Sequence, residues 1–172
     1  MTKSDLQSAR ARIRPGEQSD LPAITRLYNH YVVETHVTFD TAPFTVSERE
    51  PWFLQFDSAG HHRLWVACDE AQLLGYCTST PLKAKPAYDS SVEVSVYLQP
   101  NAQRRGIGTA LYERLFSDLP GAHRCYALIA LPNDASIALH ARFGFREMGT
   151  MTEAGHKLGR YWDVLWMERN VS

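Results

Sequence analysis

The glycine-rich turn at residues 103–109 constrains the fold more than any other part of the sequence. It reads Gln103-Arg104-Arg105-Gly106-Ile107-Gly108-Thr109, follows an alternating apolar stretch at 91–98 and opens an amphipathic helical pattern that ends before Pro120-Gly121. The first amides of a helix lack partners within the helix, and the helix dipole adds partial positive charge there. Glycines let the backbone close on an anion. The segment therefore predicts a strand–turn–helix unit that binds a pyrophosphate.

Two other phosphate-binding loops do not fit this turn. A P-loop requires Gly-Lys-Ser/Thr, whereas Gly108 is followed directly by Thr109. A dinucleotide fingerprint requires three spaced glycines and an acidic residue further along the chain, and neither is present. Taken alone, the turn is equally compatible with a glycine-capped helix start whose arginines are solvated.

The remaining patterns predict a mixed α/β protein. Apolar runs and alternation indicate strands, and apolar residues at helical spacing indicate helices. The expected strands are 11–14, 63–69, 72–81, 91–98, 124–131, 145–151 and 160–168. The expected helix starts are Asp20 as an N-cap, a capping box at Ser47-x-x-Glu50, the glycine turn, and Pro132-Asn133-Asp134. Three consecutive strands at the centre favour a mixed sheet over a doubly wound one.

Length and charge restrict the class of protein further. The chain has 172 residues, with 18 Lys and Arg against 19 Asp and Glu, so its formal net charge is −1. Such a chain has no overall field that attracts nucleic acid or an anionic membrane. It shows no apolar signal region and no run near the ~20 residues of a membrane span. We expect a polar tail over 1–11, a single domain over 12–172, and a cytoplasmic location.

Cysteine and histidine spacing suggests neither a disulfide framework nor a metal. Cys68, Cys77 and Cys125 are an odd number, widely spaced and without a CxxC pair. The first two lie in apolar strand patterns, where buried inert thiols are expected. The histidines, including His61-His62, show no ligand spacing. We expect no metal, and no covalent intermediate on a cysteine.

The turn and several segments around it resemble the GNAT acetyltransferases, and within them the phosphinothricin and methionine sulfoximine N-acetyltransferases. A strand leading into Gln-x-x-Gly-x-Gly and a helix is similar to the acetyl-CoA motif of that superfamily. The similar segments span about residues 12–169, and they are Tyr28-Asn29, Thr38-Phe39, 87–97, 131–136, Leu139-His140, Gly144-Phe145 and 155–163. The resemblance implies a GNAT fold, in which a mixed central sheet of about six to seven strands is flanked by about four helices. It also implies a splayed strand pair at the acetyl-CoA site.

The resemblance implies the reaction as well. Acetyl-CoA would be the co-substrate, and the acceptor would be the α-amine of a small amino acid or analogue, acetylated by direct transfer. Such enzymes are generally homodimers, and strand 161–166 is a candidate contact. The residues expected at acetyl-CoA are Val94, Val96, Leu98, Gln103, Arg104, Arg105, Gly106, Ile107, Gly108, Thr109, Asn133 and Ser136. For Asn133 and Ser136, a helix-capping role is the alternative.

Glu93, Tyr97 and His140 are the candidate catalytic residues. Glu93 lies on the face of its strand opposite four apolar residues, and Tyr97 shares that face. The family places the corresponding glutamate beside the substrate amine, where it would accept the ammonium proton. His140, or Tyr97, would protonate the CoA sulfur, with water as a further alternative. A solvent-facing Glu93 and Tyr97, and a packed His140, are the structural alternatives.

Substrate recognition is expected from Phe39, Lys83, Lys85 and Tyr88, together with Glu93. The lysines and Tyr88 precede the Glu93 strand and resemble residues that hold the anionic groups of the family's substrates. The family commonly has arginine at the position of Lys85, and lysine cannot form the same bidentate contact, which places phosphinothricin itself in doubt. Lys157 and Arg160 read as exposed charges at a turn, or as contacts to substrate or a partner subunit.

Three other functions remain open at this point. An acetyltransferase for protein N-termini or for polyamines would use the same co-substrate. A polyamine site favours an acidic pocket, whereas the segment before Glu93 is cationic. A CoA-binding module without catalysis is the third, although Glu93, Tyr97 and His140 are all retained.

Overall fold

The computed structural model describes residues 11–70 and 72–171 and contains a seven-stranded sheet in the order β1-β2-β3-β4-β5-β7-β6. Strands β4 and β5 are parallel, and all other neighbours are antiparallel. The predicted mixed sheet is therefore confirmed. The strands are β1 (Arg12–Pro15), β2 (Leu64–Asp69), β3 (Gln72–Pro81), β4 (Ser91–Leu98), β5 (Arg124–Ala130), β6 (Arg146–Lys157) and β7 (Arg160–Asn170).

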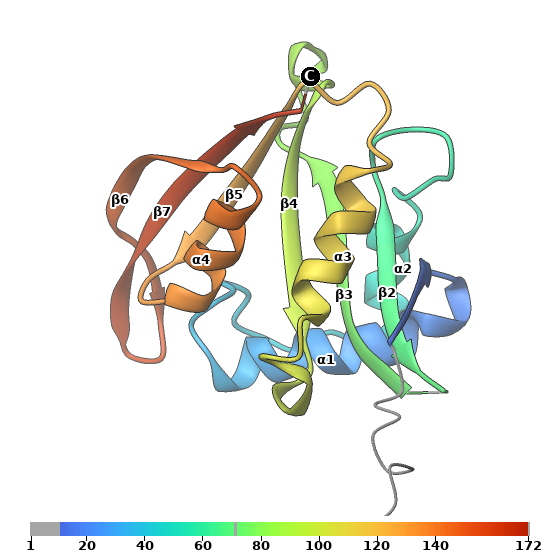
Figure 1. Ribbon diagram of the computed structural model, residues 1–172. Coiled ribbons are helices and arrows are strands. Elements are labelled where there is room, and N and C mark those ends of the chain that lie inside the picture. The colour runs from blue at the N-terminus through green and yellow to red at the C-terminus, as the bar shows by residue number, and fades with distance from the viewer. Residues whose placement is uncertain (1–10, 71, 172) are drawn as a thin grey trace, which may run out of the picture.

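Helices cover both faces of this sheet. In Figure 1, α3 and α4 lie in front of the sheet, whereas α1 and α2 lie behind it. The helices are α1 (Leu21–Glu34), α2 (Val46–Phe53), α3 (Ile107–Phe116) and α4 (Asp134–Arg142), with short 3-10 turns at η1 (Gln18–Asp20), η2 (Pro86–Tyr88) and η3 (Pro100–Ala102). The mixed sheet and the four helices agree with the predicted fold class.

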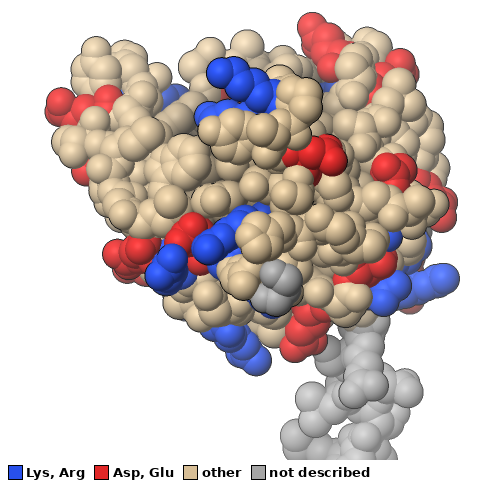
Figure 2. Space-filling model, turned by 90° about the horizontal axis from the view of Figure 1, so that it is seen from above, with Lys and Arg blue, Asp and Glu red and all other residues tan. Residues whose placement is uncertain are grey.

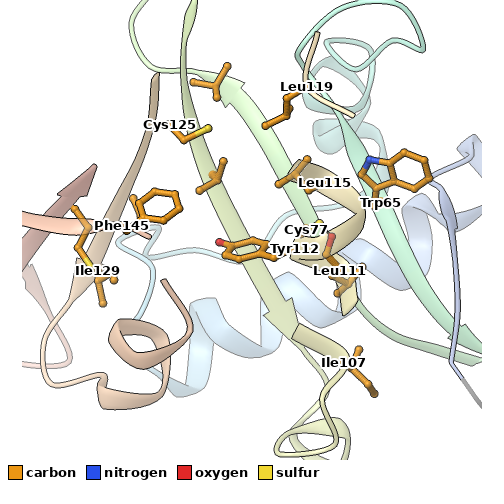
Figure 3. Close-up of a cluster of buried hydrophobic side chains, with 14 of the residues drawn as sticks. Trp65, Cys77, Ile107, Leu111, Tyr112, Leu115, Leu119, Cys125, Ile129 and Phe145 are labelled. Carbon is orange, nitrogen blue, oxygen red and sulfur yellow. Dashed lines mark hydrogen bonds between the residues drawn. The ribbon is translucent and has the colours of Figure 1, made fainter. Parts of the chain in front are cut away.

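Each face of the sheet has its own apolar core, because successive residues of a strand point to opposite faces. In β2, Trp65 and Ala67 pack on the α3 side, and Leu64 and Val66 pack on the α1 side. Figure 3 shows the α3 side, where leucines of α3 lie against Cys77 of β3. This two-sided burial explains why β2 reads as a continuous apolar run rather than an alternating one.

Strands β4 and β5 separate after a short paired stretch. The two strands pair with each other only over Ser91–Glu93 and Arg124–Tyr126. Beyond that stretch β4 continues to Leu98 and β5 to Ala130 without further hydrogen bonding between the two strands. The two strands diverge downward in Figure 1. The predicted splayed strand pair is therefore present, and the glycine turn follows directly from its β4 arm.

The caps of the first two helices differ from the prediction. Asp20 occupies the N-cap position of α1, but its carboxylate binds Arg14 at 2.6 Å and accepts a hydrogen bond from the Glu17 amide. Thr45 and Glu48 form the capping box of α2, in place of Ser47 and Glu50. Two overlapping Ser/Thr-x-x-Glu patterns occur here, and the extended backbone of Thr45 selects the earlier one.

Strand β6 is longer than predicted, extending to Lys157 rather than residue 151. Both halves are mostly exposed, and the added half, residues 152–157, has no large apolar side chain to mark it in the sequence. Gly155 in this half is required by packing, because a Cβ there would collide with the ring of Phe39. Of the predicted tail, only Ala11 falls within the described residues.

Candidate active site

Two cavities meet where β4 and β5 separate. The first, which we call the turn cavity, has a volume of about 720 Å³ and lies between the glycine turn, the splayed strands and the start of α4. The second, the aromatic cavity, has a volume of about 470 Å³ and lies between β3, β4 and the helices α1 and α2. Both cavities are lined by Val37, Ser95, Tyr97, Leu128 and Ala130. A molecule seated in one cavity can therefore contact a molecule seated in the other.

The turn cavity collects nearly all of the residues expected at acetyl-CoA. Arg105 is the exception, because it is exposed and does not line the cavity. The predicted residues that do line it are Val94, Val96, Leu98, Gln103, Arg104, Gly106, Ile107, Gly108, Thr109, Asn133 and Ser136. These residues come from three separate segments, β4, the glycine turn and the start of α4, that the fold brings to one place.

The glycine turn has the backbone geometry of an anion site. Gly106 is the N-cap of α3 in the left-handed conformation, with φ +78°, and Arg104 also has a positive φ of 59°. Such angles favour glycine and are costly for arginine, so the turn holds local strain. Its shape leaves the first amides of α3 at the wall of the cavity, where they can bind phosphate oxygens.

The splayed part of β4 directs free backbone groups into the gap. Ser91 accepts a hydrogen bond from Leu82, and Gln99 donates one to Leu74, so odd-numbered residues face β3. By alternation, Val94 and Val96 direct their amides and carbonyls toward β5. The strand can thus hydrogen-bond an extended ligand that lies where a neighbouring strand would otherwise pair.

Tyr31 of α1 joins this site although its spacing in the sequence indicates only a helix. Its hydroxyl donates to the carbonyl of Leu98 at 2.6 Å and accepts from Gln103 Nε2 at 3.4 Å. It therefore ties the end of β4 to the glycine turn. A tyrosine at helical spacing looks like a core residue. No signal in the sequence distinguishes packing in the core from a role at the edge of the turn cavity.

Glu93 and Tyr97 lie on one face of β4, as the alternation predicts, and both line the aromatic cavity. Glu93 is half-buried, and desolvation raises the pKa of its carboxyl above the usual value, with Lys83 opposing the shift. Burial raises the pKa of Tyr97 strongly, so its hydroxyl keeps its proton. The ring of Tyr97 packs against Tyr28 and Tyr76, with centroid distances of 5.3 and 5.4 Å. A proton acceptor and a proton donor are therefore held on one strand.

His140 is buried and lines the turn cavity, but both of its ring nitrogens are engaged. Nδ1 lies 2.8 Å from the carbonyl of Ser136, and Nε2 lies 2.9 Å from the hydroxyl of Tyr112. Because a carbonyl only accepts, Nδ1 carries the proton and Nε2 accepts from Tyr112. Desolvation lowers the pKa of His140, which favours this neutral form. The structural alternative of a packed histidine agrees with these contacts.

The residues expected at the substrate fall into two groups. Phe39 lines the aromatic cavity with Glu93, whereas Lys83, Lys85 and Tyr88 are exposed and do not line it. Lys83 lies over the ring of Trp166, with Nζ 5.9 Å from the centroid. The link before β4 is thus adjacent to the site without forming its wall.

Other cavity residues were not assigned a role in the site from the sequence. The Tyr28 hydroxyl of α1 donates a short hydrogen bond to Asp40 and accepts one from Thr38 at 2.7 Å. Arg49 of α2 is buried in the same cavity although its segment reads as polar. Helix-spaced aromatics and a single arginine carry no sequence signal that distinguishes a site from a core or a surface.

The segment 35–40 runs between the two cavities and is held by the β6–β7 hairpin. Lys157 is buried, which excludes the alternative of an exposed charge at a turn, and its Nζ donates to the carbonyl of Thr38 at 2.6 Å. Its burial lowers the pKa of the ammonium. His36 stacks on Trp162 with a centroid distance of 4.1 Å. Arg160 is exposed and packs over Trp162. The hairpin therefore fixes the segment that contributes Val37 to both cavities.

The structure adds three observations on general chemistry. Cys68, Cys77 and Cys125 are buried free thiols, as expected for inert strand residues. Within residues 11–70 and 72–171, no group of three His, Cys, Asp or Glu side chains is placed to hold a metal ion. No helix in that part of the chain is long and apolar enough to span a bilayer. Figure 2 shows both signs of charge distributed over one face of the molecule.

Comparison with known proteins agrees with this geometry. The profile of the acetyltransferase (GNAT) domain family matches residues 13–166. A phosphinothricin N-acetyltransferase of Streptomyces coelicolor is 55% identical, spanning 94% of this chain and 97% of that protein. An L-methionine sulfoximine/L-methionine sulfone acetyltransferase of Pseudomonas aeruginosa is 34% identical over 94% of this chain and 95% of that protein.

Solved structures show the same fold with the co-substrate bound. The phosphinothricin acetyltransferase of Sinorhizobium meliloti, solved in complex with acetyl-CoA, superimposes with a TM-score of 0.87 at 30% identity. The alignment covers 94% of this chain and 88% of that one. The strand–turn–helix unit, the splayed strands and the family match lead to one conclusion: this chain belongs to the GNAT acetyltransferase family.

Proposed function

We propose that this protein transfers the acetyl group of acetyl-CoA to the α-amine of a small amino acid or amino-acid analogue, of the phosphinothricin or methionine sulfoximine type. The observation that carries the proposal is the junction of the two cavities at Tyr97, with Glu93 on the acceptor side. The names of the relatives support this acceptor class. Direct transfer agrees with three buried, unpaired thiols that lie away from the cavity walls.

The turn cavity fits acetyl-CoA, which supplies an activated acetyl thioester when bound. The α3 amides after Gly106, with Arg104, would hold the pyrophosphate. Val94 and Val96 would hydrogen-bond the extended arm and polarise the thioester carbonyl. Asn133 caps α4 by accepting a hydrogen bond from the Ser136 amide at 3.2 Å. This bond fixes the side chain in the orientation from which it would contact acetyl-CoA. Arg105 would act at the mouth, outside the wall.

The residues of β4 would carry the proton transfers. Glu93 accepts the proton of the substrate ammonium. Its raised pKa makes the carboxylate a stronger base than an ordinary glutamate, which favours proton transfer near neutral pH. Tyr97 is protonated and touches both cavities, so it can donate toward the CoA sulfur. We assign His140 the placement of α4 and Tyr112 rather than a direct proton transfer, because both of its nitrogens are engaged.

We further propose that residues 12–172 act as one domain, that the enzyme works in the cytoplasm without a metal, and that it forms a homodimer. Support for the dimer comes from the β6–β7 hairpin, which exposes Met148, Leu158 and Tyr161 at 53, 58 and 59%. Exposed apolar side chains grouped on one hairpin are typical of a contact between subunits.

A thiol-release assay with a panel of amines tests the proposal. The panel contains L-amino acids, methionine sulfoximine, phosphinothricin, a polyamine and a short peptide with a free N-terminus. We expect release of CoA with one or more amino acids or analogues. Turnover only with the polyamine or the peptide would move the acceptor to those classes. Acetyl-CoA binding without turnover on any amine would identify a non-catalytic module.

A further inference from the structure

Arg49 is buried in the wall of the aromatic cavity without an acidic partner. It lies on α2, it is 6% exposed, and none of the ion pairs formed by the described residues includes it. Asp40 and Glu93 line the same cavity, and neither forms an ion pair with it. A buried charge without a counter-charge is unfavourable. The cavity therefore carries a positive charge that no described side chain contacts in an ion pair.

Aromatic rings pack against the guanidinium of Arg49. Its Cζ lies 3.7 Å from the centroid of the Trp52 ring and 4.5 Å from that of Tyr28. A ring attracts the cation without providing an acceptor oxygen, so these contacts leave the five N–H groups of the arginine without a conventional hydrogen-bond partner. Nε is fully buried and has no hydrogen-bond partner. The side chain is thus oriented, and its donors are unused.

Tyr76 places a second unused polar group on the same cavity. This residue of β3 is 1% exposed, and its hydroxyl is buried without a hydrogen-bond partner. Its ring packs against Trp52, with centroids 6.1 Å apart, and so belongs to the aromatic cluster that holds Arg49. Buried polar groups are normally hydrogen-bonded, and exceptions require an explanation. An anionic ligand in the cavity would satisfy both groups.

We propose that Arg49 binds the α-carboxylate of the acceptor amino acid, with the Tyr76 hydroxyl as a second donor. The inference rests on the proposed function and specifies its substrate. A carboxylate matches the two-pronged guanidinium edge, which is the strongest pairing available to an arginine. The anion-binding role expected of Lys83 and Lys85 thereby moves to α2, because those lysines lie outside the cavity wall.

The arrangement also selects among amines. An α-amino acid carries an ammonium and a carboxylate on one carbon, and the cavity presents Glu93 for the first and Arg49 for the second. A polyamine or an amino-acid amide offers no anion, and its binding would leave the guanidinium buried and unpaired. A site built to pair a polar group rejects ligands that lack the group. The cavity therefore favours free amino acids over neutral and polycationic amines.

Calorimetric titration of L-methionine sulfone and of its carboxamide, each into enzyme loaded with CoA, tests the inference without requiring turnover. We expect the wild type to bind the acid about 10- to 100-fold more tightly than the amide. Arg49→Met should abolish this difference. Arg49→Lys should retain part of the difference in affinity, because lysine keeps the positive charge but cannot form the two parallel hydrogen bonds of a guanidinium. Arg26→Met, which removes an exposed arginine of α1, is the matched control and should retain the wild-type ratio.

Three outcomes would overturn the inference. They are equal binding of acid and amide by the wild type, no binding of either, and a wild-type ratio in a folded Arg49→Met protein. Circular dichroism melting establishes whether the Arg49→Met variant is folded. If it is not, the acid-to-amide binding ratio of Arg49→Lys is used instead, and an unchanged wild-type ratio in that variant would overturn the inference. The absence of thiol release with every amine would refute the proposed function instead, and the binding ratio would still decide the role of Arg49.

Discussion

At the scale of single residues, the site depends on side chains whose environment changes their chemistry. Glu93 is an ordinary carboxylate in the sequence, but burial on β4 raises its pKa toward the range in which a base can act. Tyr97, four residues on, keeps its proton for the same reason. Alternation along one strand places both on the same side. Desolvation thus raises the proton affinity of both groups, so the carboxylate becomes a better acceptor and the phenol retains its proton.

Replacement of this carboxylate tests its role as a base. Glu93→Gln should lower kcat on the order of 100- to 10,000-fold at neutral pH, because glutamine cannot accept the ammonium proton. In the wild type, kcat/KM should fall as pH decreases through the raised pKa of Glu93, because the protonated carboxyl is inactive. This acidic limb should disappear in the variant.

Steady-state kinetics across pH measures both effects, and the acetyl-CoA dissociation constant serves as the control. That constant should be unchanged, because Glu93 lies outside the turn cavity. Turnover at the wild-type rate would remove Glu93 from the role of base.

At the scale of elements, the glycine turn and the β6–β7 hairpin set the geometry of the site. The turn positions the first amides of α3, and the hairpin holds the segment 35–40 through Lys157 and Trp162. Both depend on glycines for different reasons. Gly106 requires a left-handed backbone, whereas Gly155 requires space beside Phe39.

Gly106→Ala should weaken acetyl-CoA binding about tenfold, because relief of the left-handed strain would move the amides of the turn. Gly144→Ala is the matched control. Gly144 also has a positive φ, of 80°, and open space around it, but it lies outside the turn cavity. Both variants should lose about 1 kcal/mol of stability. Titration of acetyl-CoA, followed by tryptophan fluorescence, should separate them, and an equal loss of affinity would contradict the assignment.

Gly155→Ala should displace the ring of Phe39 and destabilise the fold by about 1–3 kcal/mol. Gly149→Ala lies on the same strand with no atom within 4 Å of the added methyl group, and should change stability by less than about 0.5 kcal/mol. Urea unfolding measures both. The double variant Phe39→Ala/Gly155→Ala should recover part of the loss. Equal effects at the two glycines would show that Phe39 does not press on β6.

At the scale of the whole molecule, stability couples to pH through His140. Its pKa is lowered in the fold, so the unfolded chain takes up a proton below its ordinary value of 6.5 while the folded chain does not. The free energy of unfolding therefore decreases as pH falls through that value, and it is unaffected above it. His140 should thus make the fold sensitive to mild acid.

His140→Gln should lose less stability between pH 8 and pH 5.5 than the wild type, by about 1 kcal/mol. Urea unfolding at the two pH values provides the comparison. His30→Gln removes an exposed histidine of α1 and controls for the loss of a histidine as such. An identical pH dependence in His140→Gln and in the wild type would rule out the coupling.

The sequence predicted the fold well where burial leaves a pattern and less well where it does not. Strands β2, β3 and β4 were located within a residue or two, because their apolar residues are continuous or alternate. The outer half of β6, residues 152–157, was missed because it has no large apolar side chain to mark it. In the site, a local motif predicted the turn, whereas Glu93 was singled out by the family resemblance and its role stays a prediction. Arg49 was missed because its segment reads as polar, and because its burial depends on the packing of α2 against Tyr28 of α1 as well as on the neighbouring Trp52.

The shared walls of the two cavities have a consequence for redesign of the acceptor range. Val37 and Ser95 line both cavities, so a substitution there that enlarges one cavity also changes the binding site of the ligand in the other cavity. Thr78 and Thr80 of β3 line only the aromatic cavity. Variation at these two threonines would alter the choice of amine while leaving the acetyl donor in place. Directed evolution toward new amines should therefore begin on β3.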